Sequence, residues 1–396
     1  MYNLQKEWFI IANGVLHIPG FIYFGEGTFS KLSELKGKKA IIVTGGNSMK
    51  KNGFVDRACE ELKNANMEVC VFDGVEENPS VKTVEEGAKK MQEFQPDWII
   101  ALGGGSAMDA AKCMWAFYEH PELKFEDIIE PGSLPELRKK AKFVGIPSTS
   151  GTASEITAFS VITDTEKHIK YPLVSDHIVP DIAIVDPVLP SKMPKSVTAN
   201  TGMDVVAHAT EALVSNIAND YTDALAIHAL KLVFEYLPKA CENPDDMEAR
   251  EKMHNASTMA GIAFTSASLG LVHSLAHKIG GEFGITHGLA NAILLPYITQ
   301  FNRKATNKVD WIEKELNVKD YPIAVRELAK KVGIPPTLKE VEEKFGFNKE
   351  KFDAVLDEMS KNAYEDPCTL TNPRESNPEI VKMIYTHAYN GEDITE

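Results

Sequence analysis

The fold is decided by the stretch WIIALGGGSAMD, residues 98–109. Its first five residues are apolar and predict a buried strand, while residues 107–118 have the periodicity of a helix. Consecutive glycines between a strand and a helix let the backbone approach a pyrophosphate, which the amides and the positive end of the helix then face. Ser106 and Asp109 have the spacing of a capping box, which we expect to hold the turn. The glycine spacing matches neither G-x-G-x-x-G nor a P-loop, so a purely structural turn is an equal alternative.

The same alternation of strand and helix extends to both sides of this stretch. Apolar, β-branched runs predict strands at 40–44 and 69–72, and helical periodicity predicts helices at 54–66 and 81–94. Strict alternation predicts an α/β domain with a parallel, Rossmann-like sheet covered by helices on both faces. Three further strands, at 143–146, 160–163 and 182–185, are expected either to extend the sheet or to form a small hairpin beside it.

The residue pattern changes after Pro187, Pro190 and Pro194, because clusters of β-branched residues almost disappear beyond them. An α/β domain is therefore expected at 1–191 and an all-α domain at 192–396, with a cleft between them as the default ligand site. The helices expected in the second domain, besides shorter ones near the C-terminus, are 197–215, 221–236, 249–266, 270–281 and 290–301.

Composition excludes several classes of protein. A length of 396 residues predicts two domains, and a net charge of −15 gives no basic field for a nucleic-acid partner. The five cysteines form no C-x-x-C pair and are odd in number, which indicates free thiols. No apolar run approaches the roughly 18 residues of a membrane span. Because the run Trp8–Ala12 is shorter than a signal-peptide core, we expect no export signal and a cytoplasmic protein.

A second polar segment, PSTSGTAS at 147–154, crowds hydroxyl groups and a glycine after another strand. Hydroxyls and an open backbone suit a phosphate or an amide of a ligand. Taken alone, the segment is better explained as a polar loop.

Two pairs of side chains stand four residues apart, Asp204 with His208 and His273 with His277, and His287 follows at a turn. On a helix, each pair projects from one face. A carboxylate buried in helices rich in Ala, Gly and Leu is costly unless a cation neutralises it. We therefore expect a metal site, and imidazoles with one carboxylate favour Fe(II), Zn(II) or Co(II) over Ca(II) or Mg(II).

Other polar residues near this set have plainer interpretations. Glu211, shortly after His208, could orient a ligand from behind or could be solvated. The isolated His228 and His254 are interpreted as core or capping residues.

With these residues in hand, the chain resembles the iron-containing (group III) alcohol dehydrogenases, and most closely their butanol dehydrogenase members. The resemblance covers nearly the whole length and is carried by four blocks, at 103–109, 147–155, 201–208 and 273–292. It implies a dehydroquinate synthase-like architecture and a homodimer.

The resemblance also implies roles for individual residues. Iron, or zinc in some relatives, would be bound by Asp204, His208, His273 and His287. His277 would not be a ligand but would lie near the nicotinamide and the substrate oxygen. The family usually has Pro where this chain has Thr286, which should leave the ligand His287 intact. Contacts with the dinucleotide are implied for Asn78, Gly104, Gly105, Ser106, Asp109, Thr149, Thr152 and Lys170.

The residues that follow the strand predicted at 40–44 favour NADP(H) over NAD(H). Relatives that use NAD often carry an Asp there, whereas this chain has Gly45, Asn47 and Ser48, with Lys50 and Lys51 close by. A carboxylate would repel a 2′-phosphate, and small residues with nearby positive charge admit one.

The expected reaction is metal-dependent hydride transfer between NADP(H) and a small primary alcohol or aldehyde, with His277 relaying the proton. The alternatives are a polyol dehydrogenase or sugar-phosphate cyclase on the same scaffold, a metal-dependent hydrolase and, least favoured, a non-catalytic binding module. A small aliphatic substrate is favoured by the apolar residues Ile156, Phe159, Phe264 and Leu269.

Overall fold

The computed structural model describes residues 14–167 and 169–395, so the run Trp8–Ala12 lies outside the described residues. The chain divides into two units. One spans residues 17–193, and the other begins at Pro194 and also takes in the described residues 14–16. The division lies two residues beyond the expected boundary.

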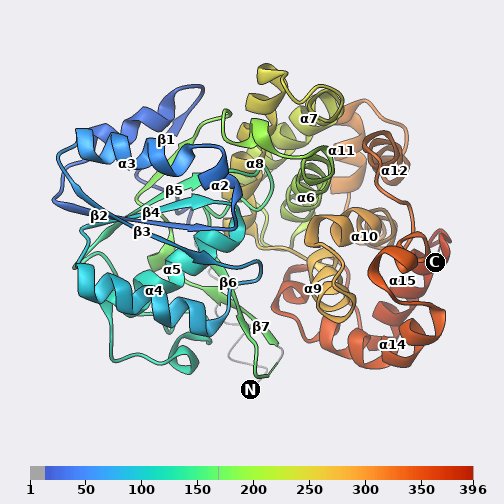
Figure 1. Ribbon diagram of the computed structural model, residues 1–396. Helices are drawn as coiled ribbons and strands as arrows, with labels where there is room; N and C mark the ends of the chain where they lie inside the picture. Colours follow the sequence, from blue (N-terminus) through green and yellow to red (C-terminus); the bar gives the residue numbers. More distant parts are fainter. Residues whose placement is uncertain (1–13, 168, 396) are drawn as a thin grey trace. The chain divides into compact units, whose positions relative to one another are not determined.

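The first unit is built on a six-stranded sheet in the order β1-β8-β5-β4-β2-β3 (Figure 1). Every neighbouring pair in it is parallel, which confirms the expected fold class. The short edge strand β1 was not expected from the sequence. The strands are β1 (Phe21–Phe24), β2 (Lys39–Gly45), β3 (Glu68–Val75), β4 (Trp98–Gly103), β5 (Lys142–Pro147) and β8 (Ile182–Val185).

Both faces of the sheet are covered. Ile41 and Ile99 point to the core beneath α4 (Val81–Phe94) and α5 (Gly105–Glu119). Their neighbours Ile42 and Ile100 point to the opposite core, beneath α3 (Phe54–Asn64) and the short helix η1 (Thr28–Glu34). Figure 1 shows α3 on one side of the sheet and α4 on the other. Burial on two faces explains why these strands are continuous apolar runs.

The structure decides between the two possibilities for the later strands. β5 and β8 extend the parallel sheet, whereas β6 (Phe159–Asp164) pairs antiparallel with β7 (Ile169–Val174) as a separate hairpin. The one-turn helix α2 (Ser48–Lys51) follows β2.

The second unit is helical, and no strand occurs among its described residues. At its centre lies α6 (Lys195–Val214), which is buried over most of its length. The expected helices are all present, although α7 continues through Pro238 because Leu237, Ala240 and Cys241 remain buried. The other helices are α7 (Asp220–Glu242), α8 (Met247–Ala267), α9 (Leu271–Phe283), α10 (His287–Asn302), α11 (Lys308–Leu316), α12 (Tyr321–Val332), α13 (Glu342–Phe345), α14 (Lys349–Tyr364) and α15 (Pro378–Asn390).

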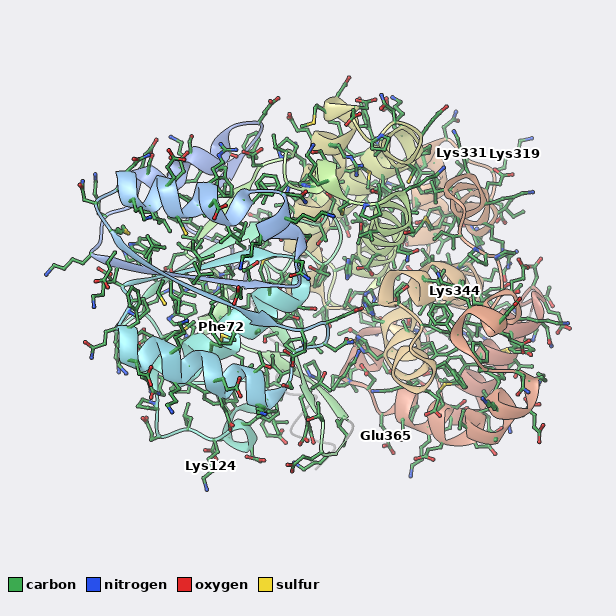
Figure 2. The ribbon with its side chains drawn as sticks, viewed as in Figure 1. Phe72, Lys124, Lys319, Lys331, Lys344 and Glu365 are labelled. Atoms are coloured by element: carbon green, nitrogen blue, oxygen red, sulfur yellow. The ribbon has the colours of Figure 1, made fainter. Side chains whose placement is uncertain are left out.

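Charged side chains lie on the outside of each unit, as Lys124 does in the first and Lys319 and Lys331 do in the second (Figure 2). All five cysteines are free thiols, as expected. Within the described ranges no single helix is long and apolar enough to span a membrane. Only α8 and α9 taken together pass that test, and they are bent by 104° where they meet.

Candidate functional site

Three helices of the second unit bring the four expected metal ligands together. Asp204 and His208 lie one turn apart on α6, His273 lies on α9, and His287 is the first residue of α10. Asp204 Oδ1 lies 3.9 Å from Nε2 of both His208 and His273, and 3.7 Å from His287 Nε2. All four candidate ligand atoms lie within 4.8 Å of one another.

The donor set fits a divalent transition metal. Asp204, His208 and His273 are each at most 4% exposed, whereas the His287 side chain is 41% exposed. Burial lowers the pKa of His273 well below its ordinary value, and the neighbouring imidazoles add to that effect. Neutral imidazoles around one carboxylate would hold Fe(II) or Zn(II) and leave the site a net positive charge.

Close approach of α10 to α6 makes this cluster possible. A Cβ on Gly288 would lie 2.2 Å from the Asn200 carbonyl oxygen and 3.3 Å from Asp204 Cβ. Only glycine therefore lets the first turn of α10 rest on the backbone of α6. This contact brings His287 to Asp204.

Glu211, which the sequence left open between two roles, is buried behind the candidate ligand His273. Its Oε2 lies 2.5 Å from His273 Nδ1, and its Oε1 accepts a hydrogen bond of 2.6 Å from the Val272 amide. Burial raises the pKa of Glu211 to about 8, against the pull of the amides of Val272, Gly270 and His273. The carboxylate fixes the His273 ring so that Nε2 faces Asp204.

His277 lies beside the ligand set but outside it. Its ring stacks on that of His287, with centroids 5.6 Å apart, and its side chain is 30% exposed. Its Nδ1 lies 3.1 Å from Asp366 Oδ2. The same oxygen forms an ion pair with Lys278 Nζ at 2.8 Å. Burial alone would raise the pKa of Asp366, but His277 and Lys278 outweigh burial and hold that pKa well below its ordinary value.

Asp366 was missed by the sequence reasoning, because it lies 89 residues after its partner His277 and no spacing connects them. Asn291 was also missed. Its position one turn after His287 on α10 was a usable signal, since that places both side chains on one face.

In the first unit, the expected dinucleotide residues gather at the carboxyl ends of β2, β4 and β5. In the sheet, β3 lies beside β2 on one side, and β4, the next strand along the chain, lies beside β2 on the other side. The strand order therefore reverses between β2 and β4. Gly45, Asn47 and Ser48 follow or end β2, and Gly104 to Ser106 follow β4. Open α/β sheets bind ligands at such a reversal point.

The glycine turn and the hydroxyl-rich segment lie against each other. A Cβ on Gly105 would lie 3.0 Å from Thr152 Cγ2, and one on Gly104 would lie 3.4 Å from Thr149 Cγ2. Glycine at 105 therefore lets the start of α5 pack closely against Thr152, where a Cβ would be crowded.

The expected capping box at Ser106 and Asp109 was wrong. The N-cap of α5 is Gly104, with no side-chain cap, so the helix begins before Ser106. Asp109 instead accepts hydrogen bonds from Ser154 Oγ (2.7 Å) and the Val161 amide (3.1 Å). Burial raises its pKa. The carboxylate thus ties α5 to the hydroxyl-rich segment and to β6.

The remaining expected cofactor residues form a second contact. Lys170 Nζ, on β7, donates a 2.7 Å hydrogen bond to Asn78 Oδ1, although the two residues are 92 positions apart. The structure also brings Asp73 of β3 to within 3.4 Å of Lys50 Nζ. The sequence reasoning overlooked this carboxylate, which partly neutralises the positive charge after β2.

Comparison with known proteins agrees with this geometry. Residues 19–187 match the family model "Iron-containing alcohol dehydrogenase", and residues 198–389 match "Fe-containing alcohol dehydrogenase family, C-terminal". The chain is 49% identical to the NADPH-dependent butanol dehydrogenase of Clostridium saccharobutylicum, over 95% of this chain and 98% of that protein.

Solved structures that resemble this chain include iron-containing alcohol dehydrogenases as well. An iron-containing alcohol dehydrogenase from Thermococcus thioreducens is 39% identical and superimposes with a TM-score of 0.87, covering 94% of this chain and 98% of that one. A 1,3-propanediol oxidoreductase, 33% identical, has a TM-score of 0.89 and coverage of 95% and 100%.

Proposed function

Because the chain belongs to the iron-containing alcohol dehydrogenase family, whose members are NAD(P)-dependent oxidoreductases, we propose that it transfers a hydride between NADP(H) and a small primary alcohol or aldehyde such as butanol or butyraldehyde. The observation that carries this proposal is the convergence of Asp204, His208, His273 and His287 in one buried cluster.

Those four residues would hold Fe(II), with Zn(II) as the alternative. The bound ion would supply a Lewis acid that lowers the pKa of the alcohol. Asp204 contributes the single negative charge, and Glu211 keeps His273 in the tautomer that offers Nε2 to the ion. Phe264 stacks on His208 with ring centroids 4.4 Å apart, which keeps that side of the cluster apolar.

His277 would move the proton of the alcohol toward solvent. Its ring lies against His287, is partly exposed and is oriented by Asp366 through Nδ1, so Nε2 remains available for exchange. Imidazole is the side chain suited to proton transfer near neutral pH. Changing His277 to Ala should alter the rate and its pH profile, and an unchanged profile would remove this role.

Preference for NADP(H) is supported by the absence of a carboxylate among Gly45, Asn47 and Ser48, and by the NADPH dependence of the butanol dehydrogenase relative. The dinucleotide would lie along Gly104 to Ser106, Thr149 and Thr152, with Asn78, Asp109 and Lys170 near it. A higher kcat/KM with NADH than with NADPH would contradict this preference.

The experiment that tests the proposed function follows the nicotinamide absorbance band in the presence of added Fe(II) or Zn(II), with butyraldehyde and NADPH or with butanol and NADP. Oxidation of NADPH that depends on the metal supports the proposal. A metal-dependent hydrolase would leave the band unchanged, and that result would overturn the proposal. We further expect a homodimer in the cytoplasm.

A further inference from the structure

Asn291 lies at the centre of the candidate metal centre and belongs to none of the roles assigned above. Its side chain is fully buried on α10, one turn after His287. Its Nδ2 lies 2.7 Å from Asp204 Oδ1 and 3.2 Å from Nε2 of both His273 and His287. One amide nitrogen therefore lies over the triangle formed by three of the four candidate ligand atoms.

The orientation of this amide follows from its neighbours. Asp204 Oδ1 can only accept hydrogen bonds, so an amide oxygen at 2.7 Å would place two acceptors in contact. The N–H group must therefore face Asp204. The opposite end of the amide, Oδ1, is buried and has no hydrogen-bond partner among the described residues.

That orphaned oxygen argues against a role in packing alone. Leaving a buried polar atom unsatisfied costs about 1–3 kcal/mol, whereas an apolar side chain of the same shape would avoid this cost. The sequence keeps an amide there, in contact with the ligand atoms. A requirement of the site accounts for that choice.

We propose that Asn291 is a positioning residue for the metal centre: it fixes the Asp204 carboxylate through its N–H and closes the face between Asp204, His273 and His287. Before a metal binds, the same N–H group lies within reach of both imidazoles and keeps the three ligands together. An oxygen ligand would then have to approach from another side. This inference rests on the proposed function, since it assumes a metal bound by these four residues.

Zn(II) binding to the full-length, metal-stripped protein tests the inference, with Asn291→Leu as the principal variant. Leu keeps the volume and removes the N–H, so the Kd for Zn(II), measured by competition with a chelator, should rise about 10- to 100-fold. Thr299→Val is the matched control, because Thr299 is also buried on α10 and its hydroxyl donates only to the Leu295 carbonyl oxygen. The control should bind Zn(II) as the unaltered protein does. An unchanged Kd in Asn291→Leu would overturn the inference.

Visible absorption of the Co(II)-loaded protein separates the proposed role from direct ligation. If Asn291 acts through Asp204, the Leu variant saturated with Co(II) should keep the band positions of the unaltered protein. Shifted bands would mean that the amide is itself a ligand and would overturn the assignment.

Asn291→Ala tests closure of the face, and it also serves for the affinity measurement if the Leu variant does not fold. Ala opens the face to water, and a higher coordination number should weaken the Co(II) bands. Bands of full intensity would contradict closure by Asn291. Failure of the metal site assumed by the proposed function looks different from all these outcomes, because the unaltered protein would then bind neither Zn(II) nor Co(II). A hydrolase would bind both ions but leave the nicotinamide band unchanged.

Discussion

The carboxylate of Glu211 lies 2.5 Å from Nδ1 of His273, whose Nε2 faces Asp204. A ligand imidazole held in this way has a fixed ring orientation and a fixed tautomer, and it becomes a stronger base. Glu211 is held in place by the hydrogen bond that it accepts from the Val272 amide and by its contact with His273. We therefore expect single side chains behind the candidate ligands to influence how well the centre holds a metal.

Glu211→Gln should raise the Kd for Zn(II) about 10- to 100-fold, because the amide keeps the size of the side chain but can donate to Nδ1 and so no longer fixes the tautomer of His273. Chelator competition measures this change. Glu235→Gln, an alteration on α7 where Glu235 pairs with an exposed lysine, is the control and should leave the Kd unchanged. Equal affinity of the Glu211 variant and the unaltered protein would refute the role of Glu211.

Asn47→Asp should lower kcat/KM for NADPH relative to NADH by about tenfold, since a carboxylate after β2 repels a 2′-phosphate with an energy on the order of 1 kcal/mol or more. Asn47 is exposed and adopts an ordinary backbone conformation, so Asp fits without strain. The comparison variant Asn64→Asp adds the same charge at the end of α3 and should leave the ratio unchanged. An unaltered ratio in Asn47→Asp would place the 2′-phosphate elsewhere.

The first turn of α10 shows how packing between helices builds the site. Gly288 rests on the backbone of α6, and both His287 and Asn291 reach Asp204 from this turn. Displacement of α10 would therefore move both His287 and Asn291 away from the Asp204 carboxylate. The glycine at 288 is required by this approach.

Gly288→Ala should destabilise the protein by about 1–3 kcal/mol and weaken Zn(II) binding, because the added Cβ would overlap the Asn200 carbonyl oxygen. Gly281→Ala, in α9, is the matched control. A Cβ there meets no atom within 4 Å, so Ala should stabilise the helix by roughly 0.5–1 kcal/mol. Thermal unfolding and chelator competition measure both effects, and wild-type behaviour of Gly288→Ala would contradict the packing argument.

Regular elements and the neighbouring candidate ligands Asp204 and His208 could be predicted from the sequence, because periodicity and i, i+4 spacing are local properties. The capping box failed because a turn of three glycines lets α5 begin two residues earlier than its polar residues indicate. Asp366 and the ion pair of Lys50 with Asp73 depend on contacts between distant segments, which no local pattern encodes. The motif residues were identified from the sequence, whereas their hydrogen-bonding partners required the structure.

For the helical unit as a whole, the bound metal should act as a cross-link between α6, α9 and α10. Zn(II) at about 100 times its Kd should stabilise the folded state by about 2.7 kcal/mol, since the unfolded chain does not assemble the site. The Tm should rise on adding Zn(II) and fall again with a chelator. Asp204→Ala should lose this response, and a variant that is stabilised as strongly as the unaltered protein would show that the ion binds elsewhere.

Metal content per chain, measured after purification without oxygen for the unaltered protein and for His287→Ala, tests the central claim most directly. His287 is the most exposed of the four candidate ligands, so its removal should leave the fold intact. We expect about one iron or zinc ion per chain in the unaltered protein, and far less in the variant together with loss of NADPH oxidation by butyraldehyde. A variant that keeps its full metal content and its turnover would contradict the account.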